Sequence, residues 1–173
     1  TQCRKLGAEV LITPTDVTDP GQVTRLVDAT VERYSNIDIL VNNAGIQHVS
    51  PVEDFAVEKW DAIIAINMSS AFHTIRLAVP DMKDLGWGRI INLASAHALV
   101  ASPFKTAYVS AKHGVLGLTK TVALELAKHN ITCTAICPGY VKTPLVEKQI
   151  PDTAKARGMT EQEGVEKVLL AAQ

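Results

Sequence analysis

The segment GRIINLAS (88–95) decides the fold class, because a short and almost wholly apolar run is typical of a strand buried on both faces of a sheet. IDILVNNAG (37–45) and ITCTAICPG (131–139) have the same character, and AEVLITPTDV (8–17) is predicted to be a strand that leads into a polar loop. Helical patterns separate these segments. Strands that alternate with helices predict an α/β fold with a doubly wound parallel sheet, which helices cover on both faces.

The predicted helices are marked by apolar residues that recur on one face and by start signals. Pro20 opens a helical stretch that runs to about Tyr34, because proline is well tolerated in the first turn of a helix. Asn67 lies inside a helical pattern although an amide is a poor helix former, so we expect a local kink there. The predicted helices cover residues 20–34, 106–129 and 160–172, and residues 57–85 are predicted to hold two helical segments around Asn67.

Polar residues follow each of the predicted strands. They are Asp16, residues 42–45, Ser95 and residues 138–139. Because parallel strands end at one edge of the sheet, the ligands of such sheets bind beyond the carboxyl ends of the strands. The sequence therefore predicts a nucleotide-binding crevice at this edge.

Tyr108 and Lys112 are four residues apart in a helical segment, and this spacing places both side chains on one face, one turn apart. A free phenol has a pKa of about 10 and is a poor base at neutral pH. An ammonium group one turn away favours the phenolate and lowers that pKa. The Ser95 hydroxyl could hold a substrate oxygen while Tyr108 takes its proton. Taken alone, the tyrosine and the lysine could equally be a solvated pair on a helix surface.

The composition argues against several classes of function. The chain has 173 residues, 47% of them apolar and 20% charged, with a net charge of −1, which is typical of one soluble globular domain. No basic cluster suggests nucleic acid, and no apolar stretch approaches the roughly 20 residues of a membrane span. The histidines show no metal-ligand spacing, so we assign no metal site. Three cysteines make no disulfide framework, and we expect reduced thiols in the cytoplasm.

The sequence shows no Gly-rich turn after a first strand, which is where a Rossmann-type site binds pyrophosphate. It begins with what resembles the tail of a helix, residues 2–6, and ends with AAQ (171–173) after a helix. We therefore expect residues 1–173 to form a single partial domain that lacks the first strand, the Gly-rich turn and the last strand. Such a piece would expose a sheet edge, so it should fold poorly or associate and have little activity by itself.

These motifs, in this order, resemble the short-chain dehydrogenase/reductase family, in the subgroup called "classical". The matching residues are Asp16-Val17, Asn42-Asn43-Ala44-Gly45, Asn67, Ser95, Tyr108-x-x-x-Lys112, and Pro138-Gly139 followed by Thr143. They cover nearly the whole chain, and together they are far more specific than the tyrosine and lysine alone. The resemblance implies a Rossmann-like fold and an enzyme that transfers hydride between a substrate carbon and a nicotinamide cofactor.

The resemblance also implies a role for each motif. Tyr108 would be the general acid and base, Lys112 would lower its pKa and bind the nicotinamide ribose, and Ser95 would position the substrate oxygen. Asn67 would hold a water that connects Lys112 to solvent, and Asp16 would accept a hydrogen bond from the adenine amino group. The residues implied in cofactor binding are Asp16, Val17, Asn42, Ala44, Gly45, Tyr108, Lys112, Pro138, Gly139, Val141 and Thr143. NAD as the cofactor rests on this resemblance alone, since the residue that senses the ribose 2′ position would lie before this chain begins.

Four further polar residues near the strand ends suggest the substrate. They are Gln47, His97, Lys105 and Gln149. One cation, one imidazole and two amides around Ser95 and Tyr108 would suit a small carboxylate, whereas an acyl chain or a steroid would favour apolar residues. The quartet resembles the bacterial 3-hydroxybutyrate dehydrogenases within the family. This implies interconversion of D-3-hydroxybutyrate and acetoacetate in a cytoplasmic homotetramer, with residues 68–86 and 106–129 packed between subunits.

Other functions stay open at this point. The same catalytic set would serve a reductase of 3-oxoacyl thioesters or a sugar dehydrogenase, and His97 and Lys105 could be ordinary exposed loop residues. A non-catalytic binding or scaffold module on a dehydrogenase fold is the alternative of another class. Dependence of substrate binding on Lys105 would distinguish a 3-hydroxybutyrate dehydrogenase, whose substrate is a carboxylate, from enzymes that act on neutral substrates.

Overall fold

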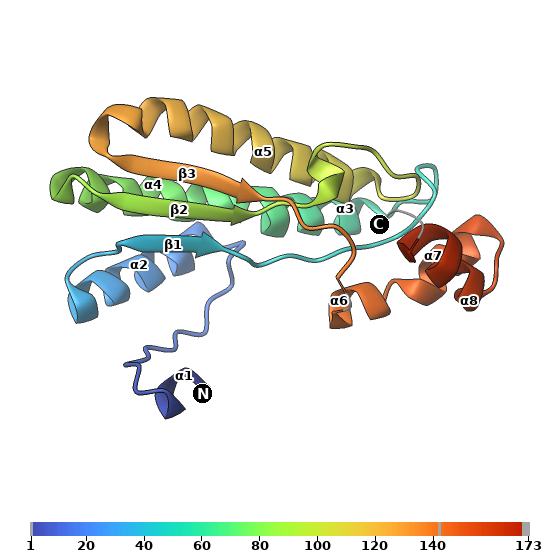
Figure 1. Ribbon diagram of the computed structural model, residues 1–173, viewed down its shortest axis with the longest axis horizontal. Coiled ribbons are helices and arrows are strands. Elements are labelled where there is room, and N and C mark those ends of the chain that lie inside the picture. Colours follow the sequence, from blue (N-terminus) through green and yellow to red (C-terminus); the bar gives the residue numbers. More distant parts are fainter. Residues whose placement is uncertain (1, 142, 171–173) are drawn as a thin grey trace.

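Three parallel strands in the order β1-β2-β3 form the sheet of this chain (Figure 1). They are β1 (Ile39–Asn42), β2 (Gly88–Leu93) and β3 (Ile131–Ile136). The computed structural model describes residues 2–141 and 143–170. Each strand lies inside one of the three apolar segments, so these strands and the α/β fold with a parallel sheet are confirmed.

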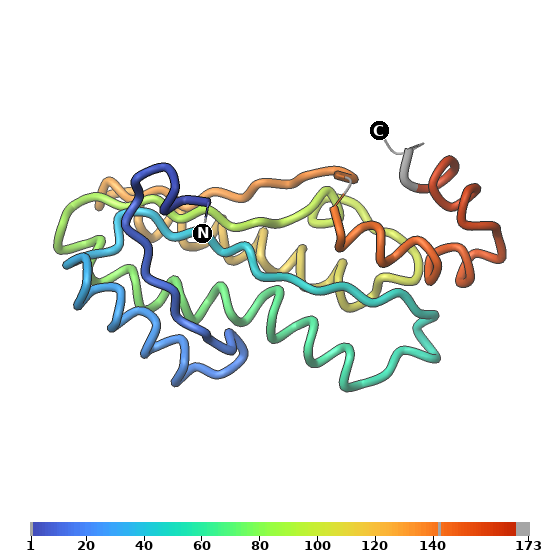
Figure 2. Tube along the Cα trace, turned by 90° about the horizontal axis from the view of Figure 1, so that it is seen from below, coloured from blue at the N-terminus to red at the C-terminus, as the bar shows by residue number. Residues whose placement is uncertain are grey.

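The long helices all cover the same face of the sheet (Figures 1 and 2). They are α2 (Pro20–Tyr34), α4 (Ser70–Leu85) and α5 (Thr106–Leu126), which the 3₁₀ turn η3 (Ala127–His129) extends. On the sheet face under these helices Ile90 is fully buried, whereas Ile39, Val41 and Ile136 on the other face are about half exposed. We expected helices on both faces. The long helices of the described residues lie on one face only: α4 and α5, which lead from β1 to β2 and from β2 to β3, cross on that side, and α2 leads into β1 there.

The hydrophobic core lies between the sheet and the helices α4 and α5. Residues of α4, of the strands β2 and β3, and of α5 contribute to it. Its buried members are Ile75, Ala78, Met82, Ile90, Val122, Leu126, Ile131 and Cys133. Removal of this apolar surface from water is what holds both helices against the strands.

The segment 8–17 is not a strand, which corrects our prediction. After the short helix α1 (Gln2–Lys5) the chain runs extended toward α2, and Leu11 and Ile12 are 42% and 61% exposed. A strand needs a neighbour for its backbone N–H and C=O groups, and no described strand pairs with this segment. Its apolar residues therefore satisfy the sequence pattern of a strand without the pairing that makes one.

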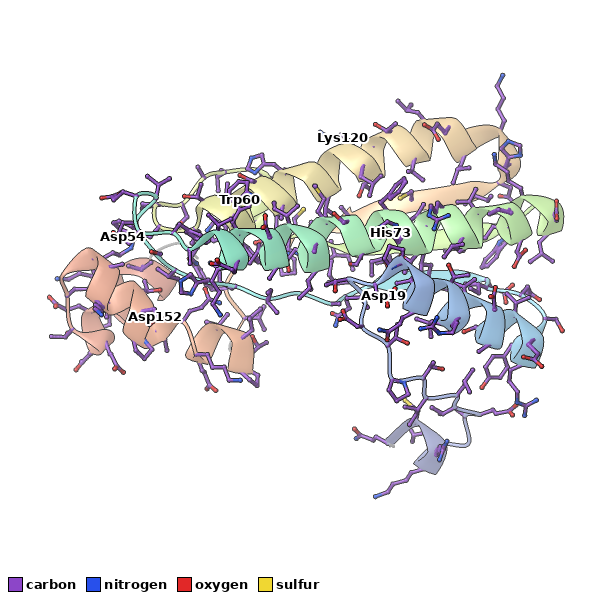
Figure 3. All side chains as sticks on the ribbon, turned by 180° about the vertical axis from the view of Figure 1, so that it is seen from behind. Asp19, Asp54, Trp60, His73, Lys120 and Asp152 are labelled. Carbon is purple, nitrogen blue, oxygen red and sulfur yellow. The ribbon has the colours of Figure 1, made fainter. Side chains whose placement is uncertain are left out.

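The predicted start of α2 at Pro20 is confirmed, and the structure adds a cap that the sequence analysis did not predict. Asp19 precedes Pro20, and its carboxylate accepts hydrogen bonds from the backbone N–H groups of Gly21 at 2.8 Å and Gln22 at 3.2 Å (Figure 3). These bonds satisfy two of the N–H groups that a helix start leaves without partners.

The predicted kink at Asn67 is present as a π-helical turn, η1 (Ala65–Ser69), between α3 (Val57–Ile64) and α4. The side chain of Asn67 forms two hydrogen bonds with one backbone residue: its Oδ1 accepts from the N–H of Ile46 and its Nδ2 donates to the C=O of Ile46, both at 2.8 Å. A widened helical turn presents the amide to a segment that a regular helix would miss. The turn thus ties the helix to the chain that follows β1.

The continuous helical segment Val57–Leu85 is longer and more apolar than we expected when we found no stretch of membrane-spanning length in the sequence. It is the one helix, among the residues that the structure describes, with the length and hydropathy to cross a membrane, at 29 residues and a mean hydropathy of 1.4 over its most apolar window. Its α4 part instead buries Ala71, Ile75, Ala78 and Met82 against the sheet and neighbouring helices. A helix that packs on a buried parallel sheet needs the same apolar composition, which explains the match.

Two short helices near the C-terminal end were not predicted, α6 (Pro144–Glu147) and α7 (Ile150–Arg157). Both begin with a proline in the first turn, which is the signal that could have revealed them. The helix predicted over 160–172 is present as α8 (Glu161–Gly164) and the π-helical η4 (Val165–Leu170); residues 171–172 of that prediction lie outside the described residues.

The contact between α4 and the start of β2 leads to a test of the core. A Cβ atom at residue 88 would lie 2.6 Å from Cγ and 2.9 Å from Cβ of Met82, which is fully buried. We therefore expect Gly88→Ala to lower the free energy of unfolding by about 1–3 kcal/mol. Gly117→Ala is the matched control, because a Cβ there meets nothing within 4 Å and alanine is the better helix former, worth about 1 kcal/mol. Urea denaturation measures both, and equal effects of the two substitutions would contradict the packing argument.

Candidate active site

Ser95, Tyr108 and Lys112 meet beyond the carboxyl end of β2. Ser95 follows the strand and caps the 3₁₀ turn η2 (Ala96–Ala98), where its Oγ accepts a hydrogen bond from the N–H of His97 at 3.1 Å. Tyr108 lies in the first turn of α5, and its hydroxyl is hydrogen-bonded to the Ser95 side chain. The two hydroxyl groups can therefore share one substrate oxygen.

Lys112 lies one turn further along α5 and is held by the strand itself. Its Nζ donates a hydrogen bond to the backbone C=O of Leu93 at 2.5 Å and lies 5.6 Å from the centre of the Tyr108 ring. Burial lowers the pKa of Lys112 to about 8, and the nearby Cys137 partly opposes this effect. Lys112 is nevertheless charged at neutral pH, because that pKa remains above 7.

The pKa of Tyr108 differs from what the spacing predicted. Burial raises the pKa of its phenol, and the hydrogen bond with Ser95 lowers it by a smaller amount. We expected the lysine to dominate and to lower it. Removing the ring from water penalises the phenolate more than these neighbours favour it, so in this state the hydroxyl is a proton donor.

A small cavity of about 160 Å³ lies directly beside the Ser95 and Tyr108 hydroxyl groups. Residues from four places in the chain form its wall: the loop after β2, the start of α5, the segment after β3, and the helices α6 and α7. The lining residues are Ser95, Ala96, His97, Val100, Lys105, Tyr108, Pro138, Gly139, Tyr140, Leu145, Val146 and Gln149. Three members of the predicted substrate quartet, His97, Lys105 and Gln149, are thus brought together in one cavity.

Lys105 is a buried cation in the wall of this cavity. Lys105 is only 4% exposed, and its Nζ donates a hydrogen bond to the hydroxyl of Tyr140 at 3.2 Å. Burial lowers the pKa of Lys105 to about 8, with a further contribution from the charge of Arg157. Burial and the charge of Lys105 lower the pKa of His97 to about 4, so this imidazole is neutral near pH 7. The alternative that His97 and Lys105 are ordinary exposed loop residues is therefore wrong.

A second, more open cleft of about 350 Å³ adjoins the first and shares Ser95, Tyr108, Pro138 and Gly139 with it. Asn43, Gly45, Lys112, Val141 and Thr143 also line this cleft. A Cβ at residue 139 would meet nothing within 4 Å, so the glycine leaves the floor of the cleft open to a flat ring. These residues fit the nicotinamide end of a dinucleotide, in reach of both Tyr108 and Lys112.

Some of the predicted site residues lie elsewhere or are already engaged. Gln47 lines neither cavity, and its buried amide has no hydrogen-bond partner among the described residues. Asn42 donates to the side chain of Asn92 at 2.9 Å and accepts from Thr74 at 2.6 Å, so its amide joins structural elements. Ala44 also lines neither cavity.

The adenine side of the predicted site is represented by Asp16 and Val17. Asp16 is exposed, and its carboxylate accepts from the side chain and backbone of Thr18 at 2.7 and 2.9 Å. These bonds hold the pKa of Asp16 below its ordinary value, so it is an anion at neutral pH. Neither Asp16 nor Val17 lines either cavity.

Asn67 was predicted to hold a water that connects Lys112 to solvent. Both polar atoms of its side chain are instead hydrogen-bonded to the backbone of Ile46.

Tyr140, Leu145 and Val146 also line the smaller cavity, and none of the three was predicted from the sequence. Tyr140 directly follows the Pro138-Gly139 motif, and that position alone could have marked it as a lining residue. Leu145 and Val146 come from α6, and only its first-turn proline offered a signal.

Comparisons with known proteins agree with this geometry. The model of the short chain dehydrogenase family matches residues 1–154. D-beta-hydroxybutyrate dehydrogenase of Rhizobium meliloti is 60% identical over 95% of this chain and 64% of its own length, and that of Cupriavidus necator is 51% identical over 91% and 61%. The crystal structure of levodione reductase superposes with a TM-score of 0.84 at 35% identity, over 92% of this chain and 61% of that one.

The chain spans less than two thirds of the length of these curated relatives. The family match nevertheless covers most of the chain, and it includes the strand ends, Ser95 and the start of α5. The chain belongs to the short-chain dehydrogenase family.

Proposed function

We propose that the complete protein is an NAD-dependent dehydrogenase that interconverts D-3-hydroxybutyrate and acetoacetate. The observation that carries this proposal is the buried Lys105 ammonium in the same small cavity as the Ser95 and Tyr108 hydroxyl groups. One end of the cavity can bind an anion, and the other can exchange a proton with an oxygen. The similarity to proteins named D-beta-hydroxybutyrate dehydrogenase supports the same substrate.

The size and charge of the cavity favour a short hydroxy acid. Its volume of about 160 Å³ is close to the roughly 150 Å³ that accommodates a molecule such as benzene. Lys105 supplies the point charge for a carboxylate, and Gln149 lines the same cavity. The Nε2 of Gln149 donates one hydrogen bond to the C=O of Leu145 at 2.9 Å, which leaves its second N–H for the substrate. A thioester or steroid would need a larger and more apolar space.

The catalytic step depends on Ser95, Tyr108 and Lys112. In the oxidation, Ser95 holds the substrate hydroxyl and Tyr108, as the phenolate, accepts its proton. The Lys112 ammonium, one turn away, favours that phenolate. In the reduction, the phenol donates the proton to the carbonyl oxygen, and the pKa that burial has raised suits this direction. A bound nicotinamide supplies or accepts the hydride.

The chain's contribution to the cofactor is the nicotinamide end of the cleft. Lys112 and Tyr108 would contact the ribose, and Gly139 leaves the space for the ring. We assign Pro138, Val141 and Thr143 to the same end, Asn42, Ala44 and Gly45 to the adenosine ribose, and Asp16 with Val17 to adenine. The choice of NAD rather than NADP follows the resemblance to the 3-hydroxybutyrate group.

We further propose a cytoplasmic homotetramer in which α4 and α5 pack between subunits. A groove of about 270 Å³ runs between these helices, and its lining is mainly apolar with the charged residues Arg76, Lys83 and Glu125 beside it. Phe72, Val79 and Leu118 line it, and the Phe72 side chain is 49% exposed. An exposed aromatic ring in a mainly apolar groove suits a second copy of this surface.

Tyr108→Phe tests the proton transfer. Removing the hydroxyl while keeping the ring should lower kcat by at least about a hundredfold, because the group that exchanges a proton with the substrate oxygen is lost. The KM for 3-hydroxybutyrate should change little, since Lys105 and the cavity wall are retained. Steady-state assays of the complete protein measure both constants, and a variant with near-normal kcat would exclude Tyr108 as the acid and base.

Lys105→Met tests the carboxylate clamp. The KM for 3-hydroxybutyrate should rise at least about tenfold, because a charge-assisted hydrogen bond is lost, while the KM for its methyl ester should stay nearly constant. Lys59→Met is the control, because this lysine of α3 is exposed and is not among the residues that line the cavity. Equal effects of Lys105→Met on acid and ester would favour a reductase of neutral substrates instead.

Phe72→Asp tests the assembly. A charge in the groove between α4 and α5 should convert the tetramer into smaller species, because a buried unpaired carboxylate opposes association. Val52→Asp, at an exposed position in a loop, should leave the molar mass unchanged. Light scattering on the eluting complete protein gives the mass, and a Phe72→Asp variant that remains tetrameric would refute the interface.

A further inference from the structure

Tyr140 connects the cation of the substrate cavity to the catalytic tyrosine. Its hydroxyl accepts a hydrogen bond from Lys105 Nζ at 3.2 Å, and the same ammonium lies 5.0 Å from the centre of its ring. On the other side His97 packs edge-on against Tyr140, with ring centres 5.8 Å apart, and edge-on against Tyr108 at 6.2 Å. The four side chains form one continuous row, Lys105, Tyr140, His97 and Tyr108.

Lys105 needs such a neighbour because its charge is buried. The side chain lies at the N-cap of α5 and is almost inaccessible to water, and within the described residues no carboxylate forms an ion pair with it. An ammonium in this position loses hydration that only a protein acceptor or a bound anion can replace. The hydroxyl and the face of one ring at Tyr140 provide both kinds of compensation.

The other ionisable groups near Lys105 cannot take that role. His97 is neutral, as its pKa of about 4 requires, and Arg157 on α7 carries a like charge whose effect is to lower the pKa of Lys105 further. Tyr108 interacts with Ser95 instead. Among these side chains of the described residues, Tyr140 is the one that offers the Lys105 ammonium both a hydrogen-bond acceptor and a ring face.

We propose that Tyr140 is a positioning residue for the carboxylate clamp: its hydroxyl and ring hold the Lys105 ammonium inside the cavity, ready for the substrate anion. This inference rests on the proposed function, because the anion is the hydroxy-acid carboxylate. The substrate carboxylate then binds an ammonium group that Tyr140 already holds in place. Binding therefore costs less conformational entropy of the Lys105 side chain.

A pH dependence follows from this arrangement. With a pKa of about 8, Lys105 is charged below pH 8 and neutral above it, so the KM for a carboxylate should rise as the pH passes through 8. Loss of the Tyr140 hydroxyl removes a hydrogen bond that favours the ammonium, so the pKa of Lys105 should fall further. The rise in KM should then begin at a lower pH.

Tyr140→Phe is the test, because it removes the hydroxyl and keeps the ring. At pH 8 we expect the KM for 3-hydroxybutyrate to rise about tenfold in the complete protein, with kcat little changed and the KM for the methyl ester unaffected. Tyr34→Phe, at the exposed end of α2, is the matched control. An unchanged KM across pH 7–9 would overturn the proposal.

A double-mutant cycle separates positioning from a purely structural effect. Once Lys105→Met has removed the charge, Tyr140→Phe should have no further effect on KM, because the two residues act through one contact. A Tyr140→Phe effect of equal size in the Lys105→Met background would show that Tyr140 acts through the fold and would refute the positioning role.

One measurement is independent of turnover. The ¹³Cε resonance of Lys105, identified by its loss in Lys105→Met, should titrate near pH 8 in the parent protein and at lower pH in Tyr140→Phe. An unshifted titration rejects the inference whatever the substrate. If the parent protein does not oxidise 3-hydroxybutyrate while the titration shifts as expected, the proposed substrate fails and the contact between Tyr140 and Lys105 stands.

Discussion

The side-chain hydrogen bond between Asn42 and Asn92 constrains the whole sheet. These residues are register partners at the carboxyl ends of β1 and β2, and Asn92, which is fully buried, also donates to Thr119 of α5 at 2.9 Å. Thr74 of α4 completes the network through Asn42. A slip of one residue would turn either amide to the other face and leave buried polar groups without partners. The network therefore aligns the strand ends, and the loops that form the site follow directly from them.

Docking of α5 against those aligned strands determines the chemistry. The helix brings Lys105, Tyr108 and Lys112 to the end of β2 within two turns, and Lys112 is anchored on the backbone of Leu93. Burial lowers the pKa of both lysines to about 8, and each is stabilised by a specific oxygen acceptor. Two buried ammonium groups on one helix cost stability, and such perturbed groups in a cavity are typical of functional sites.

The elements that the sequence predicted well are those whose pattern and packing agree. The apolar segment around β2 forms part of the hydrophobic core. Asn67 lies in a π-helical turn, as the kink expected of an amide inside a helix predicted. The failures have a shared cause. Residues 8–17 carry a strand pattern but lack a described neighbour, and α6 and α7 are too short for periodicity to reveal them. Pairing and docking are non-local, and a local pattern does not contain them.

The sequence by itself determined the parallel α/β class, the alternation of strands and helices, and the set of groups available for proton transfer, because these depend on local spacing and side-chain chemistry. The tertiary structure decided which polar groups share a cavity. It placed Lys105 beside Tyr140, directed Asn42 into the sheet, and made the pKa of Tyr108 rise through burial. Desolvation and contacts between distant segments arise only when the chain is packed, so spacing along the sequence could not reveal them.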